Sequence, residues 1–209
     1  MPHAGQFGRY AAGRPQYRGV SKLVYSMNVS LDGFIETSDH SLDWTRVDEE
    51  LHTWWKDQVE AADAFLYGRR LYEVMAAYWP SSEEDPTAPP YVKAFGRVWR
   101  TRPKIVFSSS LASVEGNSRL VRDDPVARLP ALKAEFPGGL TVGGPDLAAA
   151  FIKADLVDEY RPVVHPVVLG SGKPFLPPLN EPISLRLTDT HRFGSGAVAL
   201  CYEKEADFG

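Results

Sequence analysis

Apolar residues in this chain fall into short compact runs separated by longer segments with a different pattern. Most of these runs are rich in β-branched and aromatic residues, which is typical of strands buried on both faces of a sheet. Pro162 and Pro166 in the last run predict an edge strand or a β-bulge, because proline cannot donate to a sheet. The predicted strands cover residues 22–27, 64–67, 104–107, 118–122, 140–142 and 160–169.

Several of the intervening segments carry apolar residues at helical spacing. A capping box at Thr45 and Asp48 is expected to open the first helix, which then continues to about Ala61. Pro130 is expected to break or restart a helix that begins after Asp124, because proline lacks the N–H that a helix needs. Other helices are predicted over residues 68–78, 91–100 and 145–155, with a proline-rich surface loop over residues 80–91.

Strands that alternate with helices predict an α/β fold with a mostly parallel sheet. Residues 184–193 and 198–203 flank a glycine-containing turn and predict an antiparallel C-terminal hairpin. The length of 209 residues suits one domain, expected over residues 21–209. Residues 1–20 are expected to be a flexible N-terminal lead, and they lack the apolar core of a secretory signal.

Composition argues against several classes of function. A net charge of −4 gives no basic footprint for nucleic acid, and no apolar run is long enough to span a membrane. The single cysteine, Cys201, excludes an internal disulfide and a cysteine-based metal site. The histidines show no paired ligand spacing, so no metal is expected, and no serine lies in the G-x-S-x-G arrangement of α/β-hydrolases. We therefore expect a cytoplasmic protein whose partner is a small molecule.

The most informative segment is residues 141–147, where a predicted strand runs through Gly143 and Gly144 into a helix. Backbone N–H groups and the dipole at the start of a helix favour an anion. The two glycines have no Cβ and let the backbone approach a ligand, and Pro145 suits the first helical position. The sequence therefore indicates a phosphate site, with the alternative of a tight turn whose helix end is satisfied by Asp146.

Two further strand ends carry groups that suit an anion. Arg69 and Arg70 follow Gly68 in the first turn of a predicted helix, where a positive charge is unfavourable unless an anion or solvent compensates it. Ser108 and Ser109 follow the next predicted strand, and their hydroxyls either bind a phosphate or begin a turn. The carboxyl ends of parallel strands share one sheet edge, so these groups together predict a phosphate-rich ligand there.

A series of motifs resembles the dihydrofolate reductase-like family, specifically the reductase domain of riboflavin-biosynthesis deaminase-reductases and their stand-alone relatives. That domain is a 5-amino-6-(5-phosphoribosylamino)uracil reductase. The resemblance covers roughly residues 22–203 and implies a three-layer αβα fold. The motifs lie at residues 30–35 (SLDGFI), 68–73 (GRRLYE), 106–109 (VFSS), 142–147 (VGGPDL), 156–159 (LVDE) and 166–175 (PVVLGSGKPF).

The resemblance further implies NADPH bound along the strand ends, and a homodimer. It places the pyrophosphate at the glycine pair and the following helix end, and the other cofactor phosphates at the arginine pair. The serine pair would meet the 2′-phosphate region, and the loop over residues 30–35 would cover the nicotinamide. The implied cofactor-binding residues are Ser30, Gly33, Ile35, Gly68, Arg69, Arg70, Ser108, Ser109, Gly143, Gly144, Pro145, Asp146 and Leu147.

The substrate and the acid–base group are less defined. Asp48 and Glu49 lie only approximately where dihydrofolate reductases carry their pterin-binding acid, and capping also explains Asp48. Asp32 is the catalytic candidate, positioning the substrate or a proton-relaying water, unless it simply forms a turn with Gly33. We expect an NADPH-dependent reductase that delivers hydride to a small cyclic or carbonyl substrate, a riboflavin-pathway aminopyrimidine or a pteridine-like compound. The alternative is a non-catalytic nucleotide-binding or interaction protein on the same fold.

Overall fold

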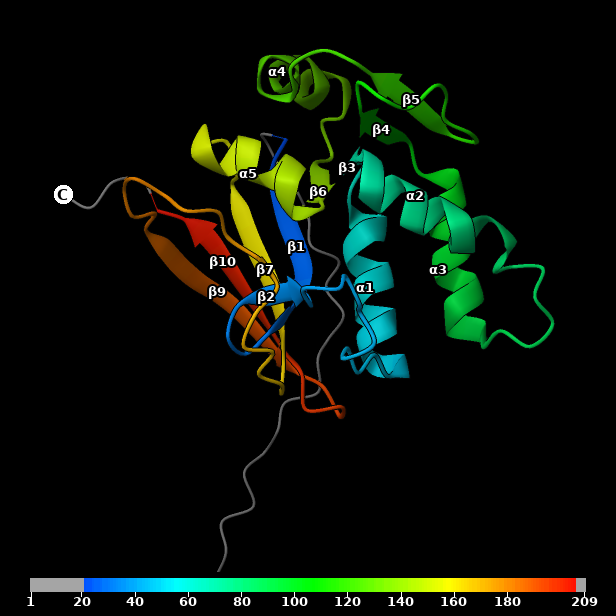
Figure 1. Cartoon of the computed structure of the whole chain (residues 1–209). Coiled ribbons are helices and arrows are strands. Elements are labelled where there is room, and N and C mark those ends of the chain that lie inside the picture. Colours follow the sequence, from blue (N-terminus) through cyan, green and yellow to red (C-terminus); the bar gives the residue numbers. More distant parts are fainter. Residues whose placement is uncertain (1–20, 206–209) are drawn as a thin grey trace, which may run out of the picture.

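The computed structural model describes residues 21–205, so the lead expected over residues 1–20 lies outside the described part. Its main sheet has eight strands, in the spatial order β5-β4-β3-β6-β1-β7-β10-β9 (Figure 1). The strands are β1 (Leu23–Ser30), β3 (Ala64–Gly68), β4 (Lys104–Phe107), β5 (Ser118–Val121), β6 (Leu140–Gly143), β7 (Glu159–His165), β9 (Leu185–Arg192) and β10 (Val198–Lys204).

The direction of the strands follows the sequence prediction. β1 pairs in parallel with β6 and β7, and β3 pairs in parallel with β4 and β6. β10 is antiparallel to both β7 and β9, which confirms the predicted C-terminal hairpin. The sheet is therefore mostly parallel with an antiparallel end, as expected for this α/β protein.

The helices form a layer on each face of the sheet (Figure 1). The two faces of β3 show the division, because Phe65 and Tyr67 pack with Phe95 of α3, whereas Leu66 packs in the cluster that contains Phe151 of α5. This confirms the three-layer αβα arrangement. On one side lie α1 (Glu49–Ala61), α2 (Arg69–Tyr78) and α3 (Pro90–Thr101), and on the other α4 (Pro125–Glu135) and α5 (Pro145–Lys153).

The first helix starts later than the sequence suggested. Asp48 is its N-cap, and the Asp48 carboxylate accepts a 2.8 Å hydrogen bond from the Leu51 N–H. Thr45 belongs to the preceding loop, where its hydroxyl donates to the Leu42 carbonyl oxygen. The predicted capping box at Thr45 is therefore wrong. In the folded chain the helix begins after Asp48, which is also a suitable N-cap residue.

Pro130 does not break α4, contrary to the prediction. The helix runs continuously through this residue, which lies on its exposed side. The neighbouring Leu129 and Leu132 are fully buried in the main core. Burial of these two leucines holds the helix together although the proline ring removes one backbone hydrogen bond.

The strand that carries Pro162 is not an edge strand, and its pairing to β10 keeps one register on both sides of the proline, so neither predicted alternative, an edge strand or a β-bulge, is found. β7 lies between β1 and β10, and Pro162 is in register with Met27 of β1. Toward β10 the paired positions are Tyr160 with Tyr202 and Val163 with Ala199, with none between them. The sheet therefore accommodates the proline where pairing to β10 is interrupted.

A small second sheet joins the segments that follow β1 and β7. β2 (Phe34–Glu36) pairs with β8 (Lys173–Pro174) in antiparallel fashion. The Leu31 N–H also donates to the Val167 carbonyl oxygen at 2.8 Å. We call the two joined segments, residues 30–36 and 167–175, the strap. Within residues 21–205, no helix has the length and apolar character needed to cross a membrane.

Candidate active site

The three strand ends singled out in the sequence lie side by side at the carboxyl edge of the sheet. β3 is bonded to β4 on one side and to β6 on the other, with Gly68 level with Phe107 and Tyr67 level with Gly143. The segments that carry the arginine pair, the serine cluster and the glycine pair therefore emerge next to one another. The shared edge was predicted from parallel pairing, and the structure adds that the three strands are direct neighbours.

Two helices begin at this edge without a side-chain cap. The N-cap residues are Gly68 in α2 and Gly144 in α5, whereas α1 and α4 are capped by the carboxylates of Asp48 and Asp124. The two uncapped ends are close, since a Cβ on Gly68 would lie 3.7 Å from the Leu147 Cβ. Unpaired N–H groups and two helix dipoles thus converge on one region, which favours an anion there.

Backbone geometry and packing explain the glycine pair in part. Gly144 has a φ of +89°, a conformation that L-residues rarely adopt. A Cβ on Gly143 would lie 2.4 Å from Cδ2 of Leu71 in α2. The space that the sequence suggested for a ligand beside Gly143 is therefore taken partly by α2.

The arginine pair already has carboxylate partners. Arg70 makes a two-pronged ion pair with Glu36 of the strap, at 2.8 and 2.7 Å. Only 8% of the Glu36 side chain is exposed, and His40 donates to it at 2.9 Å. Arg69 makes only longer contacts, at 3.4 and 3.3 Å, with the exposed Glu73. Arg69 is thus freer than Arg70 to meet a ligand.

Glu36 is an acid whose charge is stabilised by its neighbours. Burial raises the pKa of Glu36, but hydrogen bonds from Arg70 and His40 outweigh it, and the net pKa lies below its usual value. The charge of this carboxylate therefore stabilises the fold at neutral pH. It also ties the start of α2 to the strap.

Replacing Arg70 with alanine should lower the free energy of unfolding by about 1–3 kcal/mol at neutral pH, because Glu36 loses its main partner. The folded pKa of Glu36 is below its unfolded value of 4.5. The ionised Glu36 side chain therefore stabilises the fold above pH 4.5, and this stabilisation is lost as the pH falls through the folded pKa. The free energy of unfolding, measured in urea, should therefore differ less between Arg70→Ala and wild type near pH 3 than near pH 7.

Arg69→Ala is the matched control, and its free energy of unfolding is expected within about 0.5 kcal/mol of wild type. An equal loss at both pH values in Arg70→Ala would contradict the assignment.

The serine cluster forms a turn, the second of the two interpretations left open by the sequence. The Ser108 hydroxyl accepts from the N–H groups of Ser110 and Leu111, at 3.2 and 3.0 Å. Arg122, which follows β5, donates to the carbonyl oxygens of Ser108, Ser109 and Leu111. Sequence reasoning missed Arg122, although its position directly after a predicted strand could have indicated it. It adds a fixed positive charge to this edge.

Asp32 holds the strap together. Its carboxylate accepts from the Ser30 hydroxyl at 2.7 Å and from the N–H groups of Leu169 and Gly170 at 3.0 and 2.7 Å. The hydrogen bond from Ser30 is the main cause that lowers the pKa of Asp32 to about 2. Asp32 is therefore ionised at neutral pH, and both of its oxygen atoms accept hydrogen bonds within the strap.

The remaining residues predicted for the cofactor differ in accessibility. Ile35 is buried in the main core, whereas Gly33 forms a turn with a φ of +91°. Asp146 lies in the first turn of α5 with 83% of its side chain exposed, and it pairs with Lys173 of the strap. This ion pair offsets the negative charge that Asp146 places beside the uncapped helix end.

A cavity of about 380 Å³ lies beside Gly143, between the sheet and the layer of α1, α2 and α3. Its size and mainly apolar wall are typical of a small-molecule site. Because Gly143 directly precedes the uncapped start of α5, the cavity adjoins the anion-favouring edge. We call it the edge cavity. Its apolar wall includes Met27, Leu42, Val47, Trp55, Val59, Tyr67, Leu71, Val74, Met75, Trp79, Phe95 and Val142.

Asn28 brings an oriented amide to the edge cavity. Its Oδ1 accepts from the Trp55 indole N–H at 3.2 Å and from His165 Nε2 at 3.1 Å. The Arg46 N–H donates to His165 Nδ1, which assigns the ring proton to Nε2. Burial lowers the pKa of His165, so the ring is neutral. His165 therefore has a structural role, in which it orients Asn28, and the Asn28 Nδ2 amide is left to donate.

Gln58 provides a second amide at the edge cavity. Its Oε1 accepts from the guanidinium of Arg161, which also pairs with Glu159. Gln58 and Arg161 are both buried. An arginine can only donate, so the Gln58 amide is fixed with its oxygen toward Arg161. Its Nε2 is thereby available as a donor.

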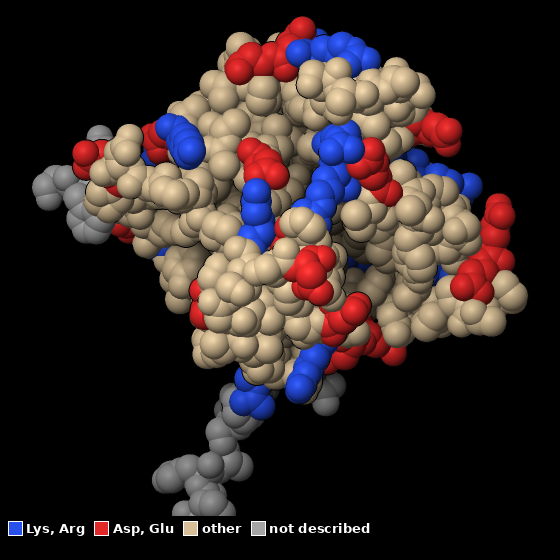
Figure 2. Space-filling model, viewed as in Figure 1, with Lys and Arg blue, Asp and Glu red and all other residues tan. Residues whose placement is uncertain are grey.

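Charge is distributed evenly over the visible surface. In Figure 2, basic and acidic side chains lie next to one another over this face, without a large area of one sign. The net charge of −4 agrees with this pattern. The local arrangement of groups, rather than an extended field, therefore distinguishes the carboxyl edge.

Comparison with known proteins identifies the family. Residues 21–199 match the model of the RibD C-terminal domain. The chain belongs to this family. It is also 31% identical to the uncharacterised protein YyaP of Bacillus subtilis over 183 residues, which cover 87% of this chain and 94% of YyaP. Membership confirms the resemblance found in the sequence and supports a reductase-type role.

Solved structures share the fold of this RibD C-terminal domain. A protein of Shewanella sp. PV-4 assigned to riboflavin biosynthesis aligns with a TM-score of 0.69 at 23% identity, covering 88% of this chain and 99% of the other. The Thermotoga maritima deaminase/5-amino-6-(5-phosphoribosylamino)uracil reductase aligns at 0.60 with 14% identity, over 88% and 57%. Dihydrofolate reductase from Enterococcus faecalis, complexed with NADP(H), aligns at 0.59 with 13% identity, over 88% and 97%. These likenesses show a dihydrofolate reductase-like fold.

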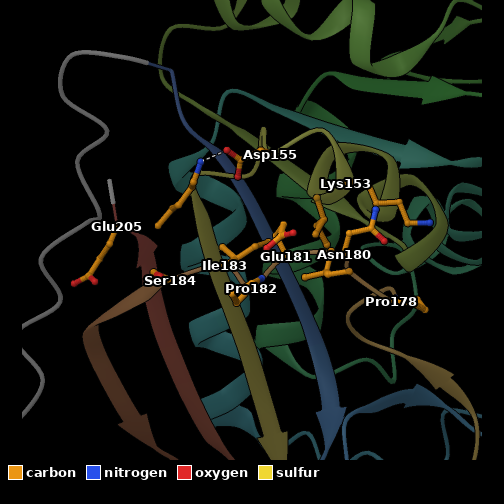
Figure 3. Close-up of a pocket in the computed structure, with 12 residues that line it drawn as sticks. Lys153, Asp155, Pro178, Asn180, Glu181, Pro182, Ile183, Ser184 and Glu205 are labelled. Carbon is orange, nitrogen blue, oxygen red and sulfur yellow. Dashed lines mark hydrogen bonds and ion pairs between the residues drawn. The ribbon is translucent and has the colours of Figure 1, made fainter. Parts of the chain in front are cut away.

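A larger cavity of about 840 Å³ in this RibD C-terminal domain lies at the opposite edge of the sheet. Figure 3 shows it between the C-terminal end of α5 at Lys153, with Asp155 just after the helix, and the segment with Asn180 and Glu181. Asp155 is already paired with Lys204. The cavity is remote from the carboxyl ends of the strands and from the uncapped helix starts, so it is not the candidate active site.

Proposed function

We propose that this protein is an NADPH-dependent reductase that delivers hydride to a small cyclic or carbonyl compound in the edge cavity. The supporting observation is that an uncapped helix start and an apolar cavity are contiguous, joined at Gly143 and Gly144. A dinucleotide needs both, because its phosphates seek N–H donors and its nicotinamide seeks a cavity that excludes water.

The residues of the carboxyl edge fit such a cofactor. The first turns of α2 and α5 would receive the pyrophosphate, because neither has a capping side chain. Arg69 and Arg122 would meet the extra phosphate beside the serine turn, which favours NADPH over NADH. The strap would cover the edge, with Asp32 as the residue that holds its two segments together. The NADP(H) complex of a dihydrofolate reductase with this fold supports the assignment.

The chain's own groups would then orient and enclose the substrate. NADPH, when bound, supplies a hydride from C4 of its nicotinamide ring. The amides of Asn28 and Gln58 would hold a substrate oxygen, and the aromatic wall would exclude water. Asp32 is ionised and held in the strap, and the cavity wall holds no carboxylate among the described residues. We therefore assign to water, rather than to Asp32, the donation of the proton that completes the reduction.

NADPH should raise the melting temperature of the protein. A ligand at 100 times its dissociation constant adds about 2.7 kcal/mol of stability, which is a shift of roughly 5–10 °C at ~2–4 °C per kcal/mol. NADH at the same concentration should give a clearly smaller shift. Arg69→Ala should weaken NADPH binding at least about tenfold, because a charge-assisted contact is lost. Differential scanning fluorimetry measures all three.

The outcome also separates the two functions that the sequence left open. Absence of a shift with millimolar NADPH would exclude the cofactor assignment. A shift without oxidation of NADPH, across quinones, pteridines and aminopyrimidine ribosides, would instead favour a non-catalytic nucleotide-binding protein. Oxidation that depends on one of these compounds would establish the reductase.

A further inference from the structure

We infer that the edge cavity takes an uncharged, flat carbonyl compound that accepts hydrogen bonds from the amides of Asn28 and Gln58, and that it rejects substrates bearing a phosphate or a carboxylate. The inference rests on the proposed function for the identity of the site. It adds the chemical class of the substrate.

The wall of the cavity has no charge to offer an anion. Among the described residues that line it there is no lysine, arginine, aspartate or glutamate. Arg161 does not line the cavity, and its guanidinium donates to the Gln58 oxygen and to the Glu159 carboxylate. An anion that enters such a wall loses its hydration without gaining a counter-charge, which is strongly unfavourable. A phosphoribosyl substrate, such as that named for the Thermotoga maritima reductase, would bring a phosphate to this wall.

Two amides of the cavity are oriented as donors. The Asn28 oxygen faces Trp55 and His165, and the Gln58 oxygen faces Arg161. Trp55 and Arg161 can only donate, so neither amide can reverse without losing a hydrogen bond. Neither amide nitrogen has a hydrogen-bond partner among the described residues, and both side chains line the cavity. A substrate therefore has to present acceptors to these two amides, and a carbonyl oxygen is the uncharged acceptor that fits.

The shape and surface of the cavity favour a flat apolar ring. Trp55, Trp79 and Phe95 form aromatic parts of the wall. His52 lies edge-on to Trp79 and Phe95, and burial lowers its pKa, so it adds no charge at neutral pH. Leu42, Val47 and Val74 also line the cavity and are exposed to solvent at 46%, 38% and 50%. An apolar rim of this kind is typical of a ligand-binding mouth.

Matched neutral and anionic probes test the inference on the full chain without cofactor. Coumarin and coumarin-3-carboxylate share one flat carbonyl ring system and differ by a charge. Uridine and uridine 5′-monophosphate differ by the phosphate of a phosphoribosyl group. In isothermal titration calorimetry the neutral member of each pair should bind at least about tenfold tighter. Equal or tighter binding of either anionic member would overturn the inference.

Amide variants test the donor groups. Asn28→Asp keeps the size of the side chain and the oxygen that Trp55 and His165 contact, but replaces the free N–H donor with an acceptor. Coumarin binding should fall at least about tenfold. Gln58→Glu should have the same effect and serves if Asn28→Asp does not fold. Asn180→Asp, which makes the same chemical change in the cavity at the opposite edge, should leave coumarin binding unchanged.

The failure of this inference can be told apart from that of the proposed function. One outcome is that NADPH gives no thermal shift, but coumarin binds to the wild type and binds more weakly to both amide variants. In that case the cofactor assignment fails and the cavity inference stands. If NADPH stabilises the protein but the anionic probes bind as well as the neutral ones, only the cavity inference fails. Unchanged coumarin affinity in a folded Asn28→Asp or Gln58→Glu protein would exclude that amide as a donor.

Discussion

Gly143→Val is expected to abolish NADPH binding and to lower the free energy of unfolding by about 1–3 kcal/mol, the usual cost of overpacking. The added Cβ would lie 2.4 Å from Leu71 Cδ2 and 3.3 Å from the Tyr67 ring, so Leu71 must leave its present position. The β-branched side chain would also stand where the edge cavity meets the start of α5. Chemical denaturation and NADPH titration of the same protein measure the two effects.

The two causes can be separated with a second substitution. Leu71→Ala removes the atom that obstructs a side chain at position 143, so the double variant should lose less stability than the sum of the single ones. NADPH binding should stay lost in the double variant. For the stability measurement, Gly68→Ala is a matched control for added bulk, because its Cβ would make only an ordinary 3.7 Å contact with Leu147. A folded double variant with wild-type NADPH affinity would mean that Gly143 serves packing alone.

Dihydrofolate should be reduced at least about a hundredfold more slowly than the best uncharged carbonyl substrate. A pterin requires a carboxylate beside its amino group and ring nitrogen, and a site lacking a charge-assisted partner loses much of its recognition. The two candidate acids do not line the edge cavity. Asp48 caps α1 and also accepts from the Ser195 N–H at 2.7 Å, and Glu49 is exposed at the start of the helix.

The measurement is NADPH oxidation with dihydrofolate, followed by the absorbance of the reduced nicotinamide. Glu49→Gln should leave the slow rate unchanged, because this side chain does not line the cavity. Rapid turnover that is lost in Glu49→Gln would show that the acid reaches the pterin and would reverse the prediction. Of the tryptophans in and just before α1, Trp55 lines the cavity, whereas Trp54 packs against Phe193 and Trp44 against His165.

The sequence by itself determined the order of strands and helices and the edge on which the candidate groups gather. Apolar runs identify buried strands, and parallel strands linked by helices must place their carboxyl ends together. The arginine pair, the serine cluster and the glycine pair could therefore be placed on one edge without any knowledge of side-chain contacts. That their strands are direct neighbours was decided by the strand order of the folded sheet. The closing hairpin was equally visible, because its turn glycines separate two strand patterns.

Local rules were less successful where tertiary packing competes with them. Thr45 and Asp48 are both acceptable caps, and only the final position of α1 selected Asp48. Pro130 disfavours a helix, yet burial of Leu129 and Leu132 outweighs that local preference. Pro162 suggested an edge strand or a β-bulge, but its place was decided by pairing with β1 and by an interruption of pairing to β10.

The partners of the functional side chains were decided by the tertiary structure alone. Arg70 of α2 pairs with Glu36 of the strap. The Asp32 carboxylate accepts hydrogen bonds from backbone N–H groups that lie 137 and 138 residues away in the chain. Asn28 and Gln58 carried no motif, because an amide becomes a directed donor only when distant groups such as His165 and Arg161 occupy its oxygen. Periodicity and spacing describe neighbours along the chain. The chemistry of this cavity depends on contacts between residues that folding alone brings together.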